Sequence, residues 1–273
     1  MSYSSRFGGI QRLYGLSVSE ALRNAHVCVI GIGGVGSWAA EALARSGIGK
    51  VTLIDLDDIC VTNTNRQVHA LKESVGQSKV AVMAERMRAI NPDMAVYTIE
   101  DFVTEDNVAQ YLDKRFDYVL DAIDAFRVKA AIIAHCKRQK ISVMTVGGAG
   151  GLVDPLKIRV VDLTKTFQDP LAKKVKDFLR YRYGFSKNNK RRFAVDCVFS
   201  EEAARYPQPD GGVCEKKPDA AAGDSMKMDC ASGFGAATMV TATFGFVAVA
   251  RIIEKLTLKL EQKSSQNPQA GRT

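Results

Sequence analysis

The chain has 273 residues, of which 46% are hydrophobic and 25% charged, a composition that fits a folded globular protein and excludes a disordered or fibrous one. Its six cysteines are scattered without a CxxC pair, so we expect neither a disulfide framework nor a structural zinc site, and we expect a reducing, cytoplasmic location. The net charge of +8 is local, because residues 165–192 contain ten Lys or Arg and two Asp while the rest of the chain is balanced. The opening residues are polar and interrupted by glycine, so no signal peptide is expected.

Strands and helices alternate through residues 26–163, which predicts a Rossmann-like core with a mostly parallel sheet and flanking helices, an α/β fold. Apolar runs predict the strands, and helical spacing of apolar residues predicts the helices between them. The strands are expected at 27–32, 50–54, 94–99, 117–120 and 141–146, and the helices at 36–46, 78–90 and 127–138.

The pattern loosens after residue 152. One more strand is predicted at 157–163, and residues 164–229 form a basic, helix-like and partly flexible segment. Residues 230–260 predict an apolar C-terminal helix packed on the core, and the polar tail 261–273 is expected to be disordered. Because residues 230–250 carry no charge, a membrane span is the alternative, but their Gly, Ala and Thr content favours a buried helix.

Glycines and carboxylates follow the predicted strands at the edge of a parallel sheet where ligands bind. The first strand is followed by a GxGxxG pattern that allows a phosphate to approach a helix N-terminus, the second by two aspartates, and the fourth by two more. These residues are Gly31, Gly33, Gly34, Gly36, Asp55, Asp57, Asp121 and Asp124. On these residues alone, an NAD-dependent oxidoreductase is the default and an ATP-using enzyme the alternative.

The residues after the second strand favour ATP. Cleavage of a triphosphate needs cations directed at its β and γ groups and a carboxylate that holds Mg²⁺. Arg66 and Lys79 can supply those cations, and Asp124 that carboxylate. Exposed surface positions are the alternative interpretation for both cations.

An ordered set of motifs covers nearly the whole chain apart from the tail. GIGGVGSWAAEALARSGIGKVTLIDLDDICVTNTNRQ, VGQSKV, INP and DAIDA resemble the ubiquitin-activating-like adenylating family, which includes ThiF, MoeB and HesA. RFGGIQRLYG, TNTNRQVHAL, TVGGAGG, DCVFS and MDCASGFGAATMVTATFGFVAV resemble one branch of it, the tRNA threonylcarbamoyladenosine dehydratases.

The resemblance implies a ThiF/MoeB-type fold with a C-terminal extension, and roles for individual residues. The nucleotide-binding set is Gly31, Gly33, Gly34, Gly36, Asp55, Asp57, Asn65 and Gln67. Within it Asp55 would hold the ribose and Asn65 the phosphates, together with Arg66 and Lys79, while Asp124 would bind Mg²⁺. Residues 1–25 would form an arm in which Arg12, with Arg6 as the other choice, crosses a homodimer into the partner's ATP site.

The resemblance also implies a reaction. N6-threonylcarbamoyladenosine at position 37 of tRNA would be dehydrated to its hydantoin form after ATP adenylates its threonyl carboxylate. The expected cofactors are ATP, Mg²⁺ and a monovalent cation, and the expected partners are tRNA, a second copy of the chain and a cysteine desulfurase system. Adenylation of a ubiquitin-like sulfur carrier is the alternative, although the paired zinc cysteines of such enzymes are missing.

The basic segment fits a tRNA substrate, because phosphate neutralisation supplies most non-specific affinity for nucleic acids. The expected tRNA-binding residues are Lys187, Lys190, Arg191 and Arg192, and the interleaved aromatics that can stack on a base are Phe167, Phe178, Tyr181, Tyr183, Phe185 and Phe193. In contrast, the spacing of Leu171, Val175, Phe178 and Leu179 predicts the buried face of a helix. Cys197, Cys214 and Cys230 are expected to be structural, with Cys230 the best candidate for a reactive thiol.

Overall fold

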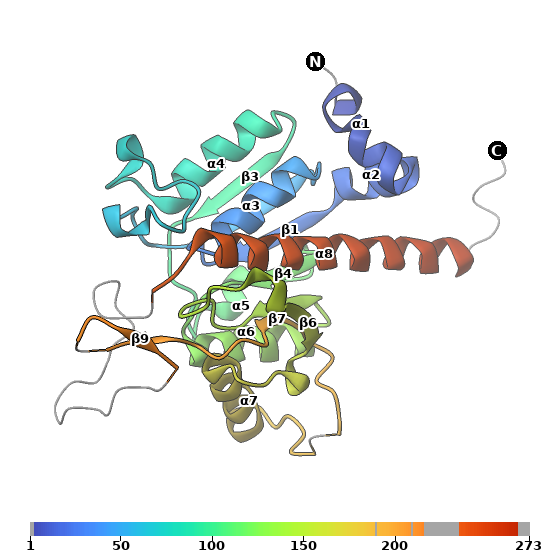
Figure 1. Cartoon of the computed structure of the whole chain (residues 1–273). Coiled ribbons are helices and arrows are strands. Elements are labelled where there is room, and N and C mark those ends of the chain that lie inside the picture. The colour runs from blue at the N-terminus through green and yellow to red at the C-terminus, as the bar shows by residue number, and fades with distance from the viewer. Residues whose placement is uncertain (1–2, 189, 209, 216–234, 267–273) are drawn as a thin grey trace.

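A seven-stranded sheet forms the centre of the computed structural model, which describes residues 3–188, 190–208, 210–215 and 235–266, with side chains up to residue 262 (Figure 1). The sheet order is β3-β2-β1-β4-β5-β7-β6, and neighbouring strands are parallel except for the antiparallel pair β6 and β7. The strands are β1 (His26–Ile30), β2 (Lys50–Ile54), β3 (Ala95–Ile99), β4 (Tyr118–Asp121), β5 (Val143–Val146), β6 (Ile158–Asp162) and β7 (Asp196–Ser200). The predicted mostly parallel sheet is confirmed.

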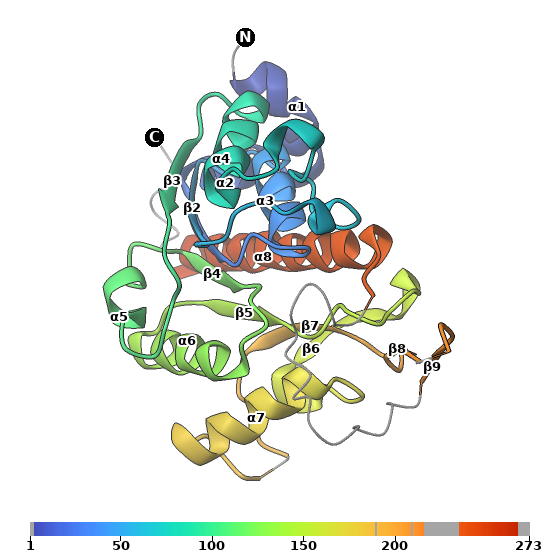
Figure 2. The ribbon, with the colours of Figure 1, turned by 90° about the vertical axis from the view of Figure 1, so that its left-hand side faces the viewer.

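Helices cover both faces of this sheet (Figure 2). One apolar core joins the strands to α3, α4 and α8, and a second joins their other side to α5, α6 and α7. The helices are α1 (Tyr3–Tyr14), α2 (Leu16–Asn24), α3 (Gly36–Arg45), α4 (Lys79–Ile90), α5 (Val108–Tyr111), α6 (Phe126–Gln139), α7 (Pro170–Arg182) and α8 (Thr238–Gln266). A short hairpin of β8 (Tyr206–Pro207) and β9 (Val213–Cys214) lies apart from the main sheet.

The strands and helices of the first half form where apolar residues predict them. In β1 and β2 the last four residues are all buried, as expected of strands covered by helices on both faces. α7 begins where Asp169 caps its N-terminus and Pro170 occupies its first position, a combination that pre-organises the first turn.

The sheet continues beyond residue 163, where the sequence predicted the core to end. β7 lies inside the predicted basic segment, yet it is inserted between β5 and β6 and is almost entirely buried. The five residues of β7 follow a charged stretch and do not alternate between apolar and polar side chains. A run this short does not stand out from the basic segment as a strand. Their burial arises because the chain returns to the sheet after α7.

The C-terminal helix α8 packs along α3 and against β5, β6 and β7. At the crossing with α3, a Cβ on Gly245 would lie 2.8 Å from the Val35 carbonyl oxygen, so the two backbones approach closely because glycine is present. α8 follows the non-helical residues 235–237, and it ends at Gln266, inside the tail predicted to be disordered. The start of the predicted helix at 230–234 lies outside the described residues. Among the described residues, no helix combines the length and the apolar character needed to cross a membrane.

Candidate active site

A cavity of about 880 Å³ opens at the carboxyl ends of β1, β2, β4 and β5, beside the point where the strand order reverses. The sequence-predicted residues that line it are Gly31, Gly33, Gly34, Asp55, Asp57, Asn65, Arg66, Gln67, Lys79 and Asp124. Those that do not are Gly36, Arg12, Lys187, Lys190, Arg191 and Arg192. The fold therefore brings the glycine turn, both predicted cations and the predicted magnesium ligand into one cavity.

The glycine turn requires glycine at its two ends. Gly31 has a φ of +85°, and a Cβ there would lie 2.9 Å from the Ile123 side chain. At Gly36, a Cβ would lie 1.8 Å from the carbonyl oxygen of Gly31, so any larger residue would push α3 away from the strand end. Gly36 thus acts by packing rather than by lining the cavity, and it keeps the N-terminus of α3 next to β1.

Asp55 braces the glycine turn with its carboxylate. One oxygen accepts a hydrogen bond from the backbone N–H of Ile32 at 2.6 Å, and the other accepts from that of Asp57 at 2.9 Å. Burial raises the pKa of Asp55 above its ordinary value, an effect that the nearby Lys79 ammonium opposes. A carboxylate offers about four acceptor positions, so both oxygens can still bind a ribose hydroxyl.

Lys79 enters the cavity from the first position of α4. The helix is capped by Ser78, whose hydroxyl oxygen accepts from the backbone N–H of Ala81. The Lys79 side chain is only 8% exposed, and its ammonium lies 2.7 Å from the exposed Asp57 carboxylate. The cation is therefore fixed at the cavity wall by an anion that is itself accessible.

Arg66 belongs to a loop that is tied to both α3 and the start of α8. Its guanidinium donates to the Thr62 carbonyl oxygen at 2.9 Å and to the Asn65 side-chain oxygen at 3.0 Å. The Asn65 amide in turn donates to the Ala236 carbonyl oxygen at 2.8 Å, and Trp38 donates to the Arg66 carbonyl oxygen at 3.0 Å. The position of Arg66 thus depends on elements far apart in the chain.

Gln67 is 6% exposed and lines the cavity, and its side-chain oxygen has no hydrogen-bond partner among the described residues. A buried amide oxygen without a partner is costly, so it is available to a polar group that enters the cavity.

Asp124 lies in the loop between β4 and α6 and is exposed to the cavity. Beneath this loop is Lys129, which is 1% exposed. Its ammonium donates to the Ile123 carbonyl oxygen at 2.9 Å and lies 3.1 Å from the fully buried carboxylate of Asp121, which also accepts from Thr145 at 2.7 Å. Lys129 therefore holds both ends of the turn that precedes Asp124, and sequence reasoning missed it.

The cavity has a second half, formed by the chain after β5 and by the residues that follow β6 and β7. Its lining includes Gly147, Gly148, Gln168, Asp169, Ser200, Glu202, Ala236 and Thr241. Asp169 accepts from the backbone N–H of Gly148 at 3.0 Å and from that of Ala172 at 2.9 Å, and burial raises the pKa of its carboxyl. A Cβ on Gly147 would lie 1.8 Å from the same carboxylate, so this glycine permits the contact.

Asp169 and Glu202 were also missed. Glu202 is 6% exposed and accepts from the backbone N–H groups of Val153 and Asp154 at 3.0 and 2.9 Å. Only Asp169 carried a local signal, because an Asp directly before a Pro is typical of a helix N-terminus.

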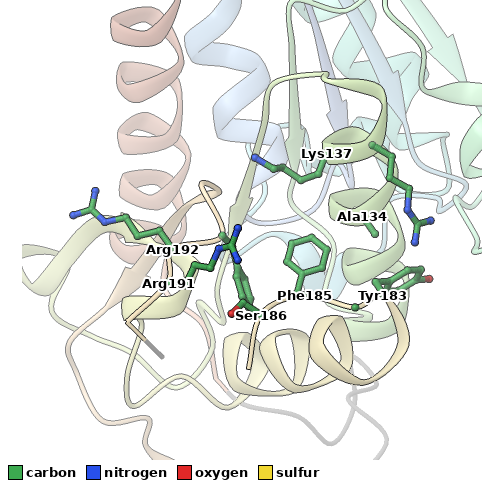
Figure 3. Close-up of a pocket in the computed structure, with 10 residues that line it drawn as sticks. Ala134, Lys137, Tyr183, Phe185, Ser186, Arg191 and Arg192 are labelled. Atoms are coloured by element: carbon green, nitrogen blue, oxygen red, sulfur yellow. The ribbon is translucent and has the colours of Figure 1, made fainter. Parts of the chain in front are cut away.

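The predicted tRNA-binding residues lie away from the cavity. Lys187 and Lys190 are exposed, and Arg191 and Arg192 line a separate pocket of about 460 Å³ (Figure 3). The predicted helix face is confirmed, since Leu171, Val175 and Leu179 are buried and Phe178 is half-buried. Of the six aromatics, Phe193 is buried at 5% exposure and Tyr181 is 85% exposed.

The cysteines do not form a reactive group among the described residues. Cys197 is buried in β7, and burial raises the pKa of its thiol, whereas Cys214 is exposed. Cys230 lies outside the described residues. No cluster of three or more metal-ligating His, Cys, Asp or Glu side chains occurs in the described ranges.

Comparison with known proteins decides the family. Residues 6–270 match the ThiF family. The chain belongs to the ThiF family. Within the ThiF family it resembles a tRNA threonylcarbamoyladenosine dehydratase of Escherichia coli K12, which is 59% identical over 258 residues that cover 94% of this chain and 96% of the relative. Its counterpart from Haemophilus influenzae is 54% identical over 94% of this chain and 95% of the relative.

A solved structure of the ThiF family gives the same result. The E. coli tRNA N6-threonylcarbamoyladenosine dehydratase TcdA in complex with ATP superposes with a TM-score of 0.84 at 54% identity, covering 95% of this chain and 96% of that chain. The expected ThiF/MoeB-type fold and the membership in the tRNA threonylcarbamoyladenosine dehydratase branch are confirmed.

Proposed function

We propose that this ThiF-family protein uses ATP to dehydrate N6-threonylcarbamoyladenosine at position 37 of tRNA to its cyclic hydantoin form, in the cytoplasm where tRNA is found. The observation that carries the proposal is a single cavity that holds a glycine turn, two cations and an exposed aspartate next to a second polar half. The relatives named as tRNA threonylcarbamoyladenosine dehydratases, one solved in complex with ATP, support it.

The first half of the cavity fits a nucleotide. The glycine turn and the N-terminus of α3 favour phosphate, and Asp55 can bind the ribose. Arg66 and Lys79 neutralise the charge that develops on the phosphates as pyrophosphate leaves. Asn65 and Gln67 can donate or accept hydrogen bonds at the same wall.

The donor set fits Mg²⁺. This ion is typically held by one or two carboxylates together with substrate phosphates, and Asp124 is an exposed carboxylate on the cavity wall. Bound there, Mg²⁺ would neutralise negative charge on the phosphates. The expected monovalent cation stays a prediction.

In the proposed reaction the tRNA nucleoside occupies the second half of the cavity, next to the nucleotide. A threonyl carboxylate oxygen attacks the α-phosphorus of ATP, the O–P bond forms, and the α–β bridging bond breaks to release pyrophosphate. A nitrogen of the substrate's own ureido group then attacks the activated carbonyl carbon and loses its proton, and AMP leaves with the former carboxylate oxygen. The net change is loss of water from the nucleoside, with ATP converted to AMP and pyrophosphate.

The ring closure is intramolecular, so it gains a high effective molarity and needs no enzyme nucleophile. The protein must position the acyl adenylate and exclude bulk water, which would hydrolyse it. This agrees with the burial of Cys197, whose raised pKa keeps the thiol protonated.

We also propose that the enzyme acts as a homodimer and that Arg12 completes the partner's nucleotide site. Arg6 donates to the Ile90 carbonyl oxygen of its own chain, whereas Arg12 is exposed and lies outside its own cavity. These positions favour Arg12 as the residue that crosses. A cysteine desulfurase partner stays a prediction.

Two other functions are less well supported. A sulfur-carrier adenylating enzyme would not require the local positive charge of residues 165–192. An NAD-dependent oxidoreductase would leave Arg66, Lys79 and Asp124 without a chemical role.

Pyrophosphate release tests the proposal. Purified protein is incubated with ATP and Mg²⁺ and with tRNA carrying threonylcarbamoyladenosine, unmodified tRNA or a ubiquitin-like sulfur-carrier protein. The proposal is supported if pyrophosphate is released with the modified tRNA but with neither of the other two substrates, and if mass spectrometry shows that the modified nucleoside has lost one water molecule. Release with the carrier protein and none with modified tRNA would overturn it.

A further inference from the structure

A second pocket lies at the far ends of the two helices that begin at the cavity. It is formed by the last turn of α6 and by the chain that follows α7 (Figure 3). Of its ten lining residues none is acidic, and four are cationic, namely Lys137, Arg138, Arg191 and Arg192. A concave surface with this charge favours an anion.

Aromatic side chains form the floor between these cations. Figure 3 shows the Phe185 ring at the centre, with Lys137, Arg191 and Tyr183 around it. Phe185 packs edge-on against Phe193 with ring centroids 4.9 Å apart, and the Arg138 guanidinium lies 5.5 Å from the Tyr183 ring centroid. The floor is therefore aromatic and largely apolar, while its rim is cationic.

The hydrogen bonds at the rim leave most of the positive charge uncompensated. Lys137 donates to the Ala194 carbonyl oxygen at 3.2 Å, which neutralises no charge. Glu105 contributes an acidic group at the edge, where its carboxylate accepts from the Tyr183 hydroxyl at 3.1 Å. None of the four cations forms a salt bridge among the described residues, so this part of the chain leaves an excess of positive charge at the pocket.

The helix pair α6 and α7 connects this pocket to the cavity. Asp124 precedes α6 and Asp169 caps α7, and both line the cavity, whereas Lys137 and Tyr183 at the other ends line the pocket. At 1.5 Å per residue, the thirteen residues of α7 span about 20 Å. The exposed charged residues along and just before α7 are Lys165, Lys173, Lys174, Asp177 and Arg182, so the surface between the two sites carries a net positive charge.

We infer that the pocket binds the phosphodiester backbone of the tRNA substrate at a point remote from the reacting nucleoside, an inference that rests on the proposed function. Each strand of a stacked duplex carries one backbone charge per about 3.4 Å of axis and an unstacked strand carries fewer, so a path of this length can still pass several phosphates. A strand whose modified base enters the cavity can thus follow α7 and place its backbone in the pocket. The length of this basic path favours a polyanion over a single phosphate.

The inference assigns a function to Arg138, which lies on α6 and outside the basic segment. The double variant Arg138→Gln/Arg192→Gln removes two positive charges from the rim. It keeps Lys137, which donates a hydrogen bond to the Ala194 carbonyl oxygen. The matched control Lys50→Gln/Lys72→Gln removes two charges from exposed positions outside both pockets. Binding of full-length tRNA is measured by fluorescence anisotropy across a KCl series, with ATP affinity and thermal melting measured on the same samples.

We expect the pocket variant to bind tRNA several-fold more weakly, with the slope of log K against log salt reduced by roughly 1.5, because each lost phosphate contact accounts for about 0.7–0.9. Its ATP affinity and melting temperature should match those of the control. If the pocket variant has the same tRNA affinity and the same salt slope as the control, the inference is overturned. The cationic pocket would then fit an acidic protein instead of tRNA. If the wild-type enzyme releases no pyrophosphate from ATP with modified tRNA, the proposed function itself is overturned.

Discussion

The Lys79 ammonium lies 2.7 Å from the Asp57 carboxylate, so a buried cation at the cavity wall is paired with an exposed anion of the same chain. The two residues come from different elements, the first turn of α4 and the loop after β2. A phosphate that enters the cavity can compete with Asp57 for the ammonium without moving the helix, because the carboxylate is accessible to water.

Lys79→Met should lower the rate of adenylation by about 100-fold or more, because a charged donor to the phosphates is lost. The measurement is ATP–pyrophosphate exchange in the presence of modified tRNA. Lys72→Met provides the control, since it removes a lysine charge from an exposed position outside the cavity. Exchange at the unmodified rate in Lys79→Met would exclude the proposed role.

Arg12 tests whether the site is shared between two subunits. Arg12→Ala and Lys79→Met should each be inactive alone, whereas an equimolar mixture after subunit exchange should recover about a quarter of the activity, because half of the dimers are mixed and each has one intact site. The assay is pyrophosphate release. A mixture that stays inactive although native mass spectrometry detects mixed dimers contradicts the exchange of Arg12 between subunits.

The two glycines of the turn should respond differently to a methyl group. Gly36→Ala places a Cβ 1.8 Å from a carbonyl oxygen and should cost about 3 kcal/mol or more of stability. At Gly33 the nearest atom to an added Cβ is the Gln67 amide nitrogen at 3.9 Å, so Gly33→Ala should fold normally and weaken ATP binding only. Urea unfolding and calorimetric titration with ATP separate the two effects, and equal stabilities would refute the packing role of Gly36.

Lys129 and Asp121 form a buried ion pair under the turn that carries Asp124. Lys129→Met should lower the free energy of unfolding by about 3–5 kcal/mol, because it leaves a buried carboxylate without its cation. The double variant Lys129→Met/Asp121→Asn should recover much of that loss, and urea unfolding of both proteins measures the difference. A double variant no more stable than the single one would show that the pair is not coupled.

His69 should make stability depend on pH. Burial lowers the pKa of His69 to about 4, below the unfolded value of 6.5, and neither ring nitrogen has a partner among the described residues. The folded state therefore disfavours the protonated ring. The stability gained by keeping His69 neutral is present above pH 6.5 and is lost as the pH falls from 6.5 to 4, by about 3 kcal/mol at 1.4 kcal/mol per pKa unit.

His69→Phe keeps a ring of similar size and cannot titrate. Unfolding by urea at pH 7.5 and at pH 4.5 should show a smaller loss of stability in this variant than in the unmodified protein. A loss of equal size in both would assign the pH dependence to other groups.

Local patterns were sufficient to predict the glycine turn and the first five strands. Four of these strands, β1, β2, β4 and β5, are mostly apolar runs that are buried almost throughout, and β3 at the sheet edge is only partly buried. The turn between β1 and α3 consists of consecutive residues, so its pattern can be recognised locally. Arg66 and Lys79 were correctly expected at the cavity, because Arg66 follows the second strand within twelve residues, Lys79 opens the next helix, and the family motif contains both.

The residues that were missed depend on contacts across the fold. Lys129 looks like an ordinary lysine of an amphipathic helix, and its burial arises only because Asp121 and Ile123 at the end of β4 surround its ammonium. Asp169 meets Gly148 across 21 residues of chain. Asp55 was assigned to a ribose, and its bonds to two backbone N–H groups became visible only in the structure.

The antiparallel pairing of β6 with β7 places all of residues 163–195 between two hydrogen-bonded neighbours, from Ile158 opposite Ser200 to Asp162 opposite Asp196. This stretch, with α7 inside it, is therefore an excursion whose two ends are held at a fixed separation. Beyond its first residues, where Asp169 holds Gly148 at the cavity, this stretch can change in length or charge without shifting the strands that shape the cavity. Substrate choice and adenylation chemistry can then diverge at separate rates in proteins that share this architecture.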